Sequence, residues 1–579
     1  MKNGDKKAED KKVRAVMWWF RRAVTYEGEP YTVDAEQARA IVCDAKNAIV
    51  VARAGSGKTR TIVAKIAYLV AQCGMKPDEI MAFVFNANAA AEVNMRLAKI
   101  MVDGRPLMAR MTVASTFHAF ARKVVFKVCG QERKYGRILV DDREEFVRAI
   151  LEKHVPRGLV QEYLRVDEGR LANEVEEEYA KLVKNVALFI NRAQQMYFGD
   201  VGELRTAVTQ TVADAETEKF WRIGMICYEK YHDYLAGRRD KRELEGVRNG
   251  NKVDLRGYGI DFNLLMKCAG ILIRQGGEEV RRLLGKKKWI LVDEYQDFSA
   301  LFLNMVQAIR EVCGEARLFV VGDDWQAINR FAGGEVEYFK EFRRYFAKDA
   351  RQLAITTNYR CDKLIVDNAR VFMRRAMQER GKFRAKSRRL GKVVLVDTGK
   401  CGEVENVYRK NISTFGAPLD MDGARYLKMV VEILRANVGR EVLILHRNNE
   451  VSFCGGMALN EFRRRLKRTV VERLMMMSEG DFERLVRVMT MHKSKGLEAE
   501  VVIIMEADAG VIPAKHAGAA LFLVFRENEQ AGMEDQKRLF YVAITRAKRR
   551  LYIIHKMKKK GENGFIEYLD RKLMDEFYE

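Results

Sequence analysis

Short runs of consecutive apolar residues recur along the chain, each followed by a turn and by the apolar spacing of a helix. Unbroken apolar runs of this length are typical of strands buried on both faces, as in parallel sheets covered by helices. The runs expected as strands are residues 48–51, 81–85, 289–292, 318–321 and 501–504. They form two sets, before and after about residue 350, which predicts an α/β fold with two parallel sheets.

Between residues 121 and 255 the pattern changes, because strand signals almost vanish and charged helical periodicity dominates, as in Glu174–Phe189. Aromatic residues such as Phe220 and Trp221 recur at helical spacing in this region. We therefore expect a large helical insertion in the first α/β unit. The basic stretch 237–252 has the composition of a solvated loop, with contact to nucleic acid as the alternative.

Composition narrows the class of protein. A chain of 579 residues is too long for one core, so several domains are expected. Its net charge of +24 suits a polyanionic partner such as nucleic acid, although a merely soluble surface gives the same excess. The nine cysteines have no metal-ligand spacing and indicate reduced thiols in a cytoplasmic protein. No apolar run is long enough for a membrane span, and no signal peptide is evident.

A glycine-rich segment, Ala52–Thr59, follows the first expected strand and precedes a helix expected over Arg60–Val70. Such a loop surrounds phosphates with backbone N–H groups at a helix N-terminus. Lys58 would reach the β- and γ-phosphates, and Thr59 would hold Mg²⁺. Ala52 replaces the first glycine of the general pattern. The residues expected to form the cradle are Ala54, Gly55, Ser56 and Gly57.

An acidic pair, Asp293 and Glu294, ends the apolar run 289–292. In parallel α/β sheets, ligands bind at the carboxyl ends of the strands. We expect Asp293 to hold Mg²⁺ and Glu294 to orient or deprotonate the attacking water. A carboxylate pair at a strand end is often merely solvated, but the phosphate loop favours the functional interpretation.

Further segments extend this set in a fixed order: Gln37, Thr116–His118, Asp261–Leu265, Gly322–Ile328, Asn358–Arg360, Thr490–Glu498 and Tyr541–Ala547. With the phosphate loop and the acidic pair, they resemble the superfamily 1 helicases of the UvrD/Rep/PcrA group over residues 31–555. In motif detail they are most similar to the helicase IV type. Two segments depart from the family pattern, at Asn86–Asn88 and at Asn329–Ala332.

The resemblance implies ATP and Mg²⁺ bound between two RecA-like P-loop domains. The implied catalytic residues are Lys58, Asp293, Glu294, Gln326, Arg360 and Arg546, the last two being arginine fingers from the second domain. The residues implied to bind the rest of the nucleotide are Gln37, Arg60, Tyr359 and Glu498. The residues implied to contact DNA are Phe85, Thr116, His118, Phe331, Arg447 and His492. For Phe85 and Phe331, core packing is the alternative.

The resemblance also implies a domain order. It consists of a basic N-terminal extension (1–30), domain 1A (31–120 and 256–348), a helical insertion 1B (121–255), domain 2A (349–555) and a C-terminal tail (556–579). Between Arg447 and Thr490 the chain is too short for the second helical domain, 2B, of many relatives, so we expect it to be absent or vestigial. The basic run 463–468 in that stretch is either a solvated helix face or a track for DNA.

The implied function is an ATP-dependent DNA helicase or single-strand DNA translocase, with 3′→5′ polarity and a role in DNA repair or replication. Its expected partners are single-stranded DNA and single/double-strand junctions, with a protein partner as a further candidate. No membrane partner is expected, and a monomer is favoured. An ATP-driven remodeler of a protein–nucleic acid complex such as RNA polymerase is the alternative. A passive binder with a decayed ATP site is disfavoured, because Lys58, Glu294, Arg360 and Arg546 are all present.

Overall fold

The structure is a computed structural model. It describes residues 3–108, 112–128, 143–166, 172–196, 201–235, 261–379, 381–402, 404, 421–452, 456–514, 519–525, 529–556 and 563–576. The side chains of residues 3–5, 331, 519 and 576 are outside this description. The stretch 237–252, expected as a solvated loop, also lies outside the described residues.

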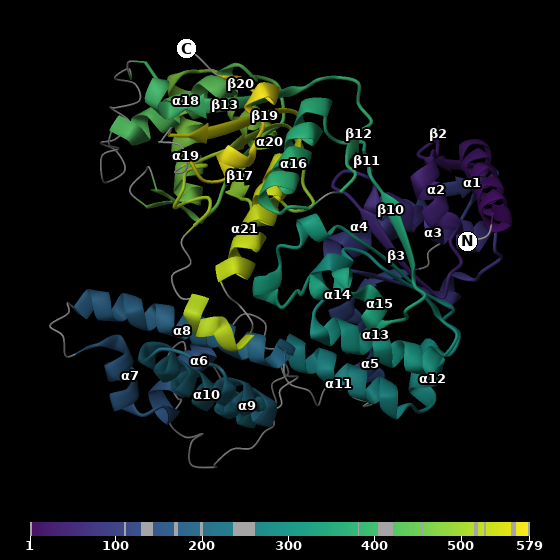
Figure 1. The fold of residues 1–579 in the computed structure, drawn as a ribbon, viewed down its shortest axis with the longest axis horizontal. Helices are drawn as coiled ribbons and strands as arrows, with labels where there is room; N and C mark the ends of the chain where they lie inside the picture. The colour runs from purple at the N-terminus through teal and green to yellow at the C-terminus, as the bar shows by residue number, and fades with distance from the viewer. Residues whose placement is uncertain are drawn as a thin grey trace.

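The first domain is built on a six-stranded sheet with the order β10-β3-β9-β8-β4-β7, in which all neighbours are parallel (Figure 1). Its strands are β3 (Asn47–Ala52), β4 (Ile80–Val84), β7 (Ala114–Thr116), β8 (Trp289–Val292), β9 (Arg317–Gly322) and β10 (Arg351–Ile355). Four of the five runs expected as strands lie here and are confirmed as β3, β4, β8 and β9.

Helices cover both faces of this sheet because alternate strand residues point to opposite sides. Val50 faces a core formed with α2 (Ala35–Val42), α3 (Lys58–Ala71) and α4 (Ala87–Ala98). Its neighbour Ile49 faces a second core. The helices of that second core are α5 (Phe117–Val128), α11 (Phe262–Gln275), α12 (Glu278–Leu284) and α13 (Ala300–Cys313).

The N-terminal segment, expected as a basic extension, packs onto the first domain. Helix α1 (Asn3–Ala23) places Phe20 in the core beside α2. Strand β1 (Val24–Tyr26) then pairs antiparallel with β2 (Glu29–Pro30) and with β5 (Ile100–Val102), and β5 also pairs with β6 (Arg105–Pro106). The apolar face of α1 explains this docking, because its basic residues lie on the opposite, exposed face.

The second domain has another six-stranded sheet, with the order β17-β14-β18-β19-β13-β20 and parallel neighbours. Its strands are β13 (Lys392–Asp397), β14 (Val442–His446), β17 (Val486–Thr490), β18 (Ala499–Ile504), β19 (Ala547–His555) and β20 (Asp575–Glu576). The run 501–504 is confirmed within β18. Helices α16 (Lys363–Ala376) and α21 (Glu529–Ile544) share one core of this domain, and α18 (Met421–Arg435) lies in the other.

Between Arg447 and Thr490 the described residues form no separate domain. The elements are β15 (Glu450–Val451), β16 (Met457–Ala458), α19 (Leu459–Arg468), the π-helix η9 (Thr469–Arg473) and α20 (Glu479–Leu485). Phe462, Val470 and Phe482 from these elements are buried in the core of the second domain. The expectation of little or no insertion in the second domain is confirmed.

Helix α19 carries the basic run 463–468, and its charges are paired locally. Arg463 contacts Glu483 and Arg464 contacts Glu461 at 3.2 Å. Lys467 lies 2.6 Å from Glu479 and 2.9 Å from Glu483. Because nearby carboxylates already neutralise these cations, the solvated helix face is the better interpretation.

The helical insertion consists of α6 (Arg143–His154), α7 (Arg157–Leu164), α8 (Ala172–Met196), α9 (Val201–Gln210) and α10 (Ala215–Leu235), around one apolar core. At its root, the buried Asp261 carboxylate accepts hydrogen bonds from Gln194 Nε2 at 2.7 Å and from Tyr231 Oη at 2.9 Å. Helix α5 packs with the first domain, where Ala121 and Val124 are buried. The expected large helical insertion is therefore confirmed.

A segment from the second half of the chain completes the insertion's core. The 3₁₀ helix η11 (Ala519–Phe525), which precedes α21, buries Leu521, Phe522 and Phe525 among α8 and α10. Trp221 Nε1 donates a hydrogen bond to Leu521 O at 2.8 Å. Figure 1 shows α21 reaching from the second domain towards the insertion. The insertion thus contacts chain segments on both sides of the interdomain cleft.

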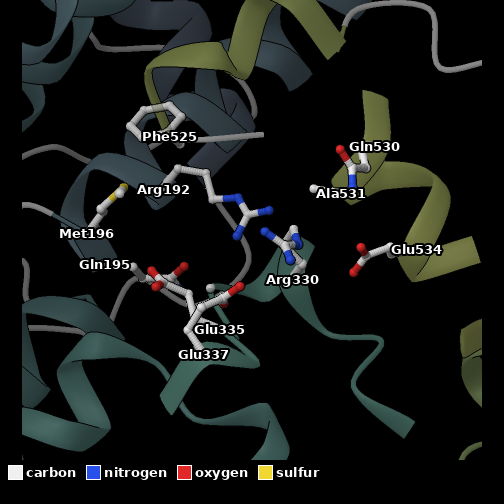
Figure 2. A pocket seen from close by; sticks show the side chains of 11 residues that line it. Arg192, Gln195, Met196, Arg330, Glu335, Glu337, Phe525, Gln530, Ala531 and Glu534 are labelled. Atoms are coloured by element: carbon white, nitrogen blue, oxygen red, sulfur yellow. The ribbon is translucent and has the colours of Figure 1, made fainter. Parts of the chain in front are cut away.

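Beside this docked segment lies a cavity of about 430 Å³, lined by residues from all three parts of the molecule (Figure 2). Arg192 comes from α8, Arg330 from the first domain and Glu534 from α21. Arg330 also forms an ion pair with Asp535 at 3.0 Å. The insertion, the first domain and α21 therefore meet at one junction.

Candidate functional site

The glycine-rich loop connects β3 to α3 with two residues in the left-handed region, Gly55 at φ 65° and Gly57 at φ 83°. A Cβ on Gly55 would lie 2.6 Å from Asn358 Nδ2, so only glycine fits there. Ser56 is fully buried, and its Oγ has no hydrogen-bond partner among the described residues. An orphan hydroxyl at a helix N-terminus suits a phosphate ligand.

Thr59 and Asp293 meet as the sequence predicts. Thr59, in the first turn of α3, donates from Oγ1 to Asp293 Oδ2 at 2.9 Å. Asp293 follows β8, the strand after next in the sheet from β3. Two oxygen ligands beside a phosphate loop fit Mg²⁺, which prefers hard oxygen donors.

Glu294 follows in the left-handed region at φ 52°, uncommon for a residue with a Cβ, and this turns its carboxylate towards the cavity. Burial and the neighbouring Glu294 charge raise the pKa of Asp293. Burial also acts to raise the pKa of Glu294, but Lys58 and Lys495 outweigh it and lower that pKa. The two lysines therefore favour the ionised form of Glu294.

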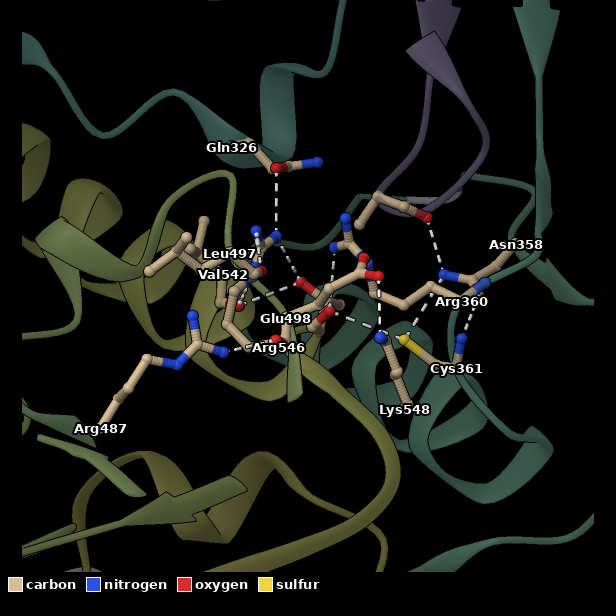
Figure 3. Close-up of polar contacts among 12 residues, drawn as sticks. Gln326, Asn358, Arg360, Cys361, Arg487, Leu497, Glu498, Val542, Arg546 and Lys548 are labelled. Carbon is tan, nitrogen blue, oxygen red and sulfur yellow. Dashed lines mark hydrogen bonds and ion pairs between the residues drawn. The ribbon is translucent and has the colours of Figure 1, made fainter. Parts of the chain in front are cut away.

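Two arginines of the second domain line the same cavity, of about 790 Å³, as Lys58 and Glu294. Arg360 Nε donates to Glu498 Oε2 at 2.6 Å, and its Nη1 donates to Thr545 O at 3.2 Å (Figure 3). Glu498 also pairs with Lys548 at 3.1 Å. The Arg360 guanidinium thus lies in the cleft between the domains.

Arg546 is almost fully buried, and burial followed by the nearby Arg360 charge lowers its pKa to about 9. Its Nε donates to Val542 O at 2.9 Å, and its Nη2 donates across the cleft to Gln326 Oε1 at 3.3 Å (Figure 3). The structure therefore brings Gln326 and both arginines together with the phosphate loop.

The residues expected around the base come from both domains, Gln37 and Arg60 from the first and Tyr359 from the second. Gln37 is held in the capping box of α2 with Asp34, and its Nε2 donates to Ser56 O at 3.0 Å. The Tyr359 hydroxyl crosses the cleft to the Asp34 carboxylate. The Arg60 guanidinium lies 4.4 Å from the centre of the Tyr31 ring. Ala54 is buried, and its carbonyl accepts from Asn358 Nδ2 at 2.7 Å.

The residues expected to contact DNA fall into two groups. Phe85, which directly follows β4 and is 40% exposed, and His492, two residues after β17, line the cleft cavity. The pKa of His492 is lowered to about 4, mainly by burial and further by the charges of Arg447 and Lys495. The Arg447 Nε atom is buried with no hydrogen-bond partner among the described residues.

His118 and Thr116 are placed differently. The His118 ring packs against Phe262 and Phe302, with ring centres 4.9 and 5.7 Å away, and burial lowers its pKa. Thr116 Oγ1 accepts from the Ala119 N–H at 3.1 Å, which caps α5. For Phe331 the backbone lies in η5 (Arg330–Ala332), and the side chain is outside the described residues.

Sequence reasoning did not single out two cations, of which Lys495 lines the site and Arg53 lies beside it. Lys495 of the second domain contacts the Asp297 carboxylate and donates from Nζ to Gln326 O at 3.0 Å. Arg53 precedes the phosphate loop's glycines and contacts Asp323 and Asp324. Lys495 lies in the recognised segment 490–498, but which of its side chains crosses the cleft depends on how the domains pack. No helix among the described residues has the length and apolar character to cross a membrane.

Comparisons with known proteins agree with this geometry. Residues 33–347 match the UvrD/REP helicase N-terminal domain, and residues 457–558 match the UvrD-like helicase C-terminal domain. Together they confirm the expected RecA-like α/β domains.

Several curated proteins are similar over most of the chain. DNA helicase IV of Escherichia coli is 25% identical, over 92% of this chain and 69% of that protein. A probable DNA helicase of Mycoplasma pneumoniae is 24% identical, over 90% of this chain and 82% of that protein. The ATP-dependent DNA helicase Rep of Escherichia coli is 27% identical, over 58% and 43%. Since the first domain match alone spans more than half of the sequence, this chain belongs to the UvrD/REP helicase family.

Proposed function

We propose that the chain is an ATP-dependent DNA helicase and single-strand DNA translocase that moves 3′→5′. The observation that supports this most is the meeting of Lys58 and Glu294 from one domain with Arg360 and Arg546 from the other around one cavity. A site divided between two domains changes their separation when its ligand changes, which is what a stepping motor requires.

In this proposal ATP is the substrate, and the chain supplies positioning and charge. Lys58 and the loop N–H groups bind the phosphates, and Glu294 orients the attacking water and accepts its proton. Arg360 and Arg546 neutralise the charge that develops on the γ-phosphate. Mg²⁺ would be held by Thr59 and Asp293 and would offset phosphate charge. Gln37, Arg60 and Tyr359 bind the base, and Glu498 exchanges its contact with Arg360 for the ribose.

The DNA contacts in this proposal come from both domains. Phe85 offers an exposed ring on which any base can stack, at about 1–3 kcal/mol per base. Arg447 and His492 contact the strand on the second domain, and Thr116, His118 and Phe331 contact it on the first. Because stacking and phosphate contacts ignore base identity, little sequence preference is expected. The similarity to DNA helicases favours a DNA motor over a polymerase remodeler.

A strand-displacement assay tests the function and its polarity together. Wild type and Lys58→Ala are compared on duplexes with a 3′ or a 5′ single-stranded tail, made of DNA or RNA. We expect ATP-dependent displacement from the 3′-tailed DNA, and none by Lys58→Ala although it still binds the oligonucleotide.

The matched control is Lys46→Ala, which removes an exposed lysine of the same domain whose ion-pair partner among the described residues is Glu315. Its displacement rate should equal that of wild type. Displacement by Lys58→Ala at the wild-type rate would refute the phosphate assignment. Displacement from the 5′-tailed duplex instead would contradict the proposed 3′→5′ polarity. ATP hydrolysis that no single strand stimulates would refute the proposal that the chain is a nucleic-acid motor.

A further inference from the structure

Arg53 is a buried cation inside the loop region that we propose binds phosphate, yet it is not among the residues that line the cleft cavity. Its side chain is 9% exposed. Nη1 lies 2.8 Å from Asp323 Oδ1 and 2.6 Å from Asp324 Oδ1. Burial acts to lower the pKa of Arg53, but the two carboxylates outweigh it and raise the pKa. The group is therefore a permanent charge that joins two separate loops of the first domain.

Asp323 contacts both Arg53 and Gln326. Asp323 is fully buried, with Oδ1 facing Arg53 and Oδ2 accepting from Gln326 Nε2 at 2.6 Å. The amide nitrogen therefore faces the carboxylate, and Oε1 faces Arg546 at 3.3 Å (Figure 3). If the amide were flipped, its N–H₂ group would face the Arg546 guanidinium and its oxygen would face the Asp323 carboxylate. Neither contact could be a hydrogen bond. The network thus allows only one orientation of the Gln326 amide.

Arg53 also stacks on Trp325, the residue directly before Gln326. Its guanidinium carbon lies 3.8 Å from the centre of the Trp325 ring. Trp325 is buried in the core of the second domain, perpendicular to Tyr541 at 5.4 Å between ring centres. Tyr541 belongs to α21, whose last turn leads to Arg546. One stack therefore joins the phosphate loop to the helix that ends just before Arg546.

The space around this stack is closed. A Cβ added at Gly381 would lie 2.6 Å from Trp325 Cζ2 and 3.1 Å from Arg53 Nη2. The Arg53 backbone N–H is fixed as well, donating to Ile355 O at 3.0 Å. The guanidinium consequently has little freedom to leave Asp323, and no other described group takes its place between the carboxylates and the indole.

We propose that Arg53 is a positioning residue for the ATP-cleaving site: it fixes Asp323 and Trp325, and through them it holds the Gln326 amide oxygen towards Arg546. The inference rests on the proposed function, because it assumes that Gln326 and Arg546 act on the γ-phosphate. It adds a residue whose side chain touches neither nucleotide nor DNA. Loss of Arg53 should therefore slow cleavage while leaving nucleotide affinity nearly unchanged.

A double-mutant cycle tests this directly. Turnover at saturating ATP and single-stranded DNA, and the affinity for ATP, are measured for wild type, Arg53→Met, Gln326→Ala and the double variant. We expect Arg53→Met to reduce kcat about tenfold to a hundredfold, as for a misplaced catalytic group, with KM for ATP changed less than about threefold. In the Gln326→Ala background the same change should have no further effect.

Arg53→Lys guards against a folding defect, because it keeps a buried cation but loses the planar fork and the stack. It should fold like wild type and show an intermediate kcat. Arg282→Met is the matched control, since the ion pairs that Arg282 makes within the described part of the chain, with Glu278 and Glu279, are exposed. It should leave kcat unchanged.

The outcomes distinguish a failure of the proposed role of Arg53 from a failure of the proposed ATPase function. Reductions that multiply in the double variant, or an Arg53→Met variant with wild-type kcat, would overturn the role of Arg53 while leaving the proposed ATPase intact. Wild-type turnover by Gln326→Ala would instead refute the proposed role of Gln326 and this inference with it. Loss of ATP affinity in Arg53→Met without a change in kcat would assign Arg53 to binding and also contradict the inference.

Discussion

His492 and Arg447 lie together on the second domain, and burial sets their charge states. Because the pKa of His492 is lowered to about 4, its imidazole is neutral at pH 7. The cation of the pair is Arg447, so His492 can meet DNA only as a hydrogen-bonding or stacking group. Affinity for a single strand should therefore not depend on the protonation of His492 between pH 6 and 8.

The lowered pKa of His492 also predicts a pH dependence of stability. Below about pH 6.5 the unfolded chain binds a proton at this residue, whereas the folded chain does so only near pH 4. Stability therefore falls as the pH decreases through this window. Between pH 7 and 5, the free energy of unfolding of wild type should decrease by on the order of 1 kcal/mol more than that of His492→Gln. Denaturant titrations at the two pH values measure this difference.

The exposed neighbour Lys493 provides the control, because lysine does not titrate in this range. Lys493→Gln should show the pH dependence of wild type. An identical pH dependence in His492→Gln and wild type would mean that burial does not shift this histidine.

At the residue scale, the sequence predicts contacts that the motif itself dictates. Thr59 and Asp293 meet because a phosphate loop and an acidic strand end share one edge of a parallel sheet. The partners of Arg53 and Lys495 could not be predicted this way. Arg53 finds Asp323 through the turn after β9, and Lys495 finds Asp297 across two domains, so both contacts depend on packing that no local pattern encodes.

At the scale of elements, η11 docks in the helical insertion far from its neighbours in sequence. Phe522 is 7% exposed there, with its ring centre 6.1 Å from that of Phe220. Phe525 packs on Phe189 at 5.1 Å. The segment therefore contributes to the insertion's stability although it belongs to the connection between β18 and α21.

Phe522→Ala should destabilise the insertion by about 3 kcal/mol, because it removes a buried aromatic side chain and leaves a cavity. Amide hydrogen exchange in α10 would measure this locally, as faster exchange than in wild type. Val212→Ala is the control, since Val212 is 91% exposed on the same insertion and should change stability by less than about 0.5 kcal/mol. Unchanged exchange in α10 would contradict the docking of η11.

The elements show the same division between predictable and unpredictable features. Strands such as β8 follow from their own apolar runs, and helix α8 follows from its periodicity. The two-residue strand β20 and the helix η11 carry too few residues for a period to appear. Their positions follow from the surfaces they cover, β13 and the insertion, and so only from the folded chain.

At the scale of the whole molecule, the charge of +24 does not identify the nucleic-acid surface. In the densest basic run, on α19, several cations are paired with Glu461, Glu479 and Glu483. The dependence of affinity on salt reports how many phosphates a protein neutralises, with a slope of about −0.7 per contact on single strands. This slope can therefore locate the contacts that matter.

Arg464→Gln combined with Lys467→Gln should leave the salt slope for an oligonucleotide within about 0.3 of wild type, as measured by fluorescence anisotropy. Arg447→Gln should reduce the slope by about 0.7, because one phosphate contact is lost. If α19 were a track for DNA, its double variant would reduce the slope by about 1.4 instead. That result would contradict the local neutralisation seen here.

The dependence of the insertion on η11 has a consequence for how the protein is made. Helices α6–α10 leave the ribosome first, and the residues that fill their apolar groove follow about 280 positions later, tens of seconds at the usual rate of synthesis. During that interval the groove is open to other apolar chains. The nascent chain should therefore be more prone to aggregation, and more dependent on chaperones, before residue 525 has emerged than afterwards.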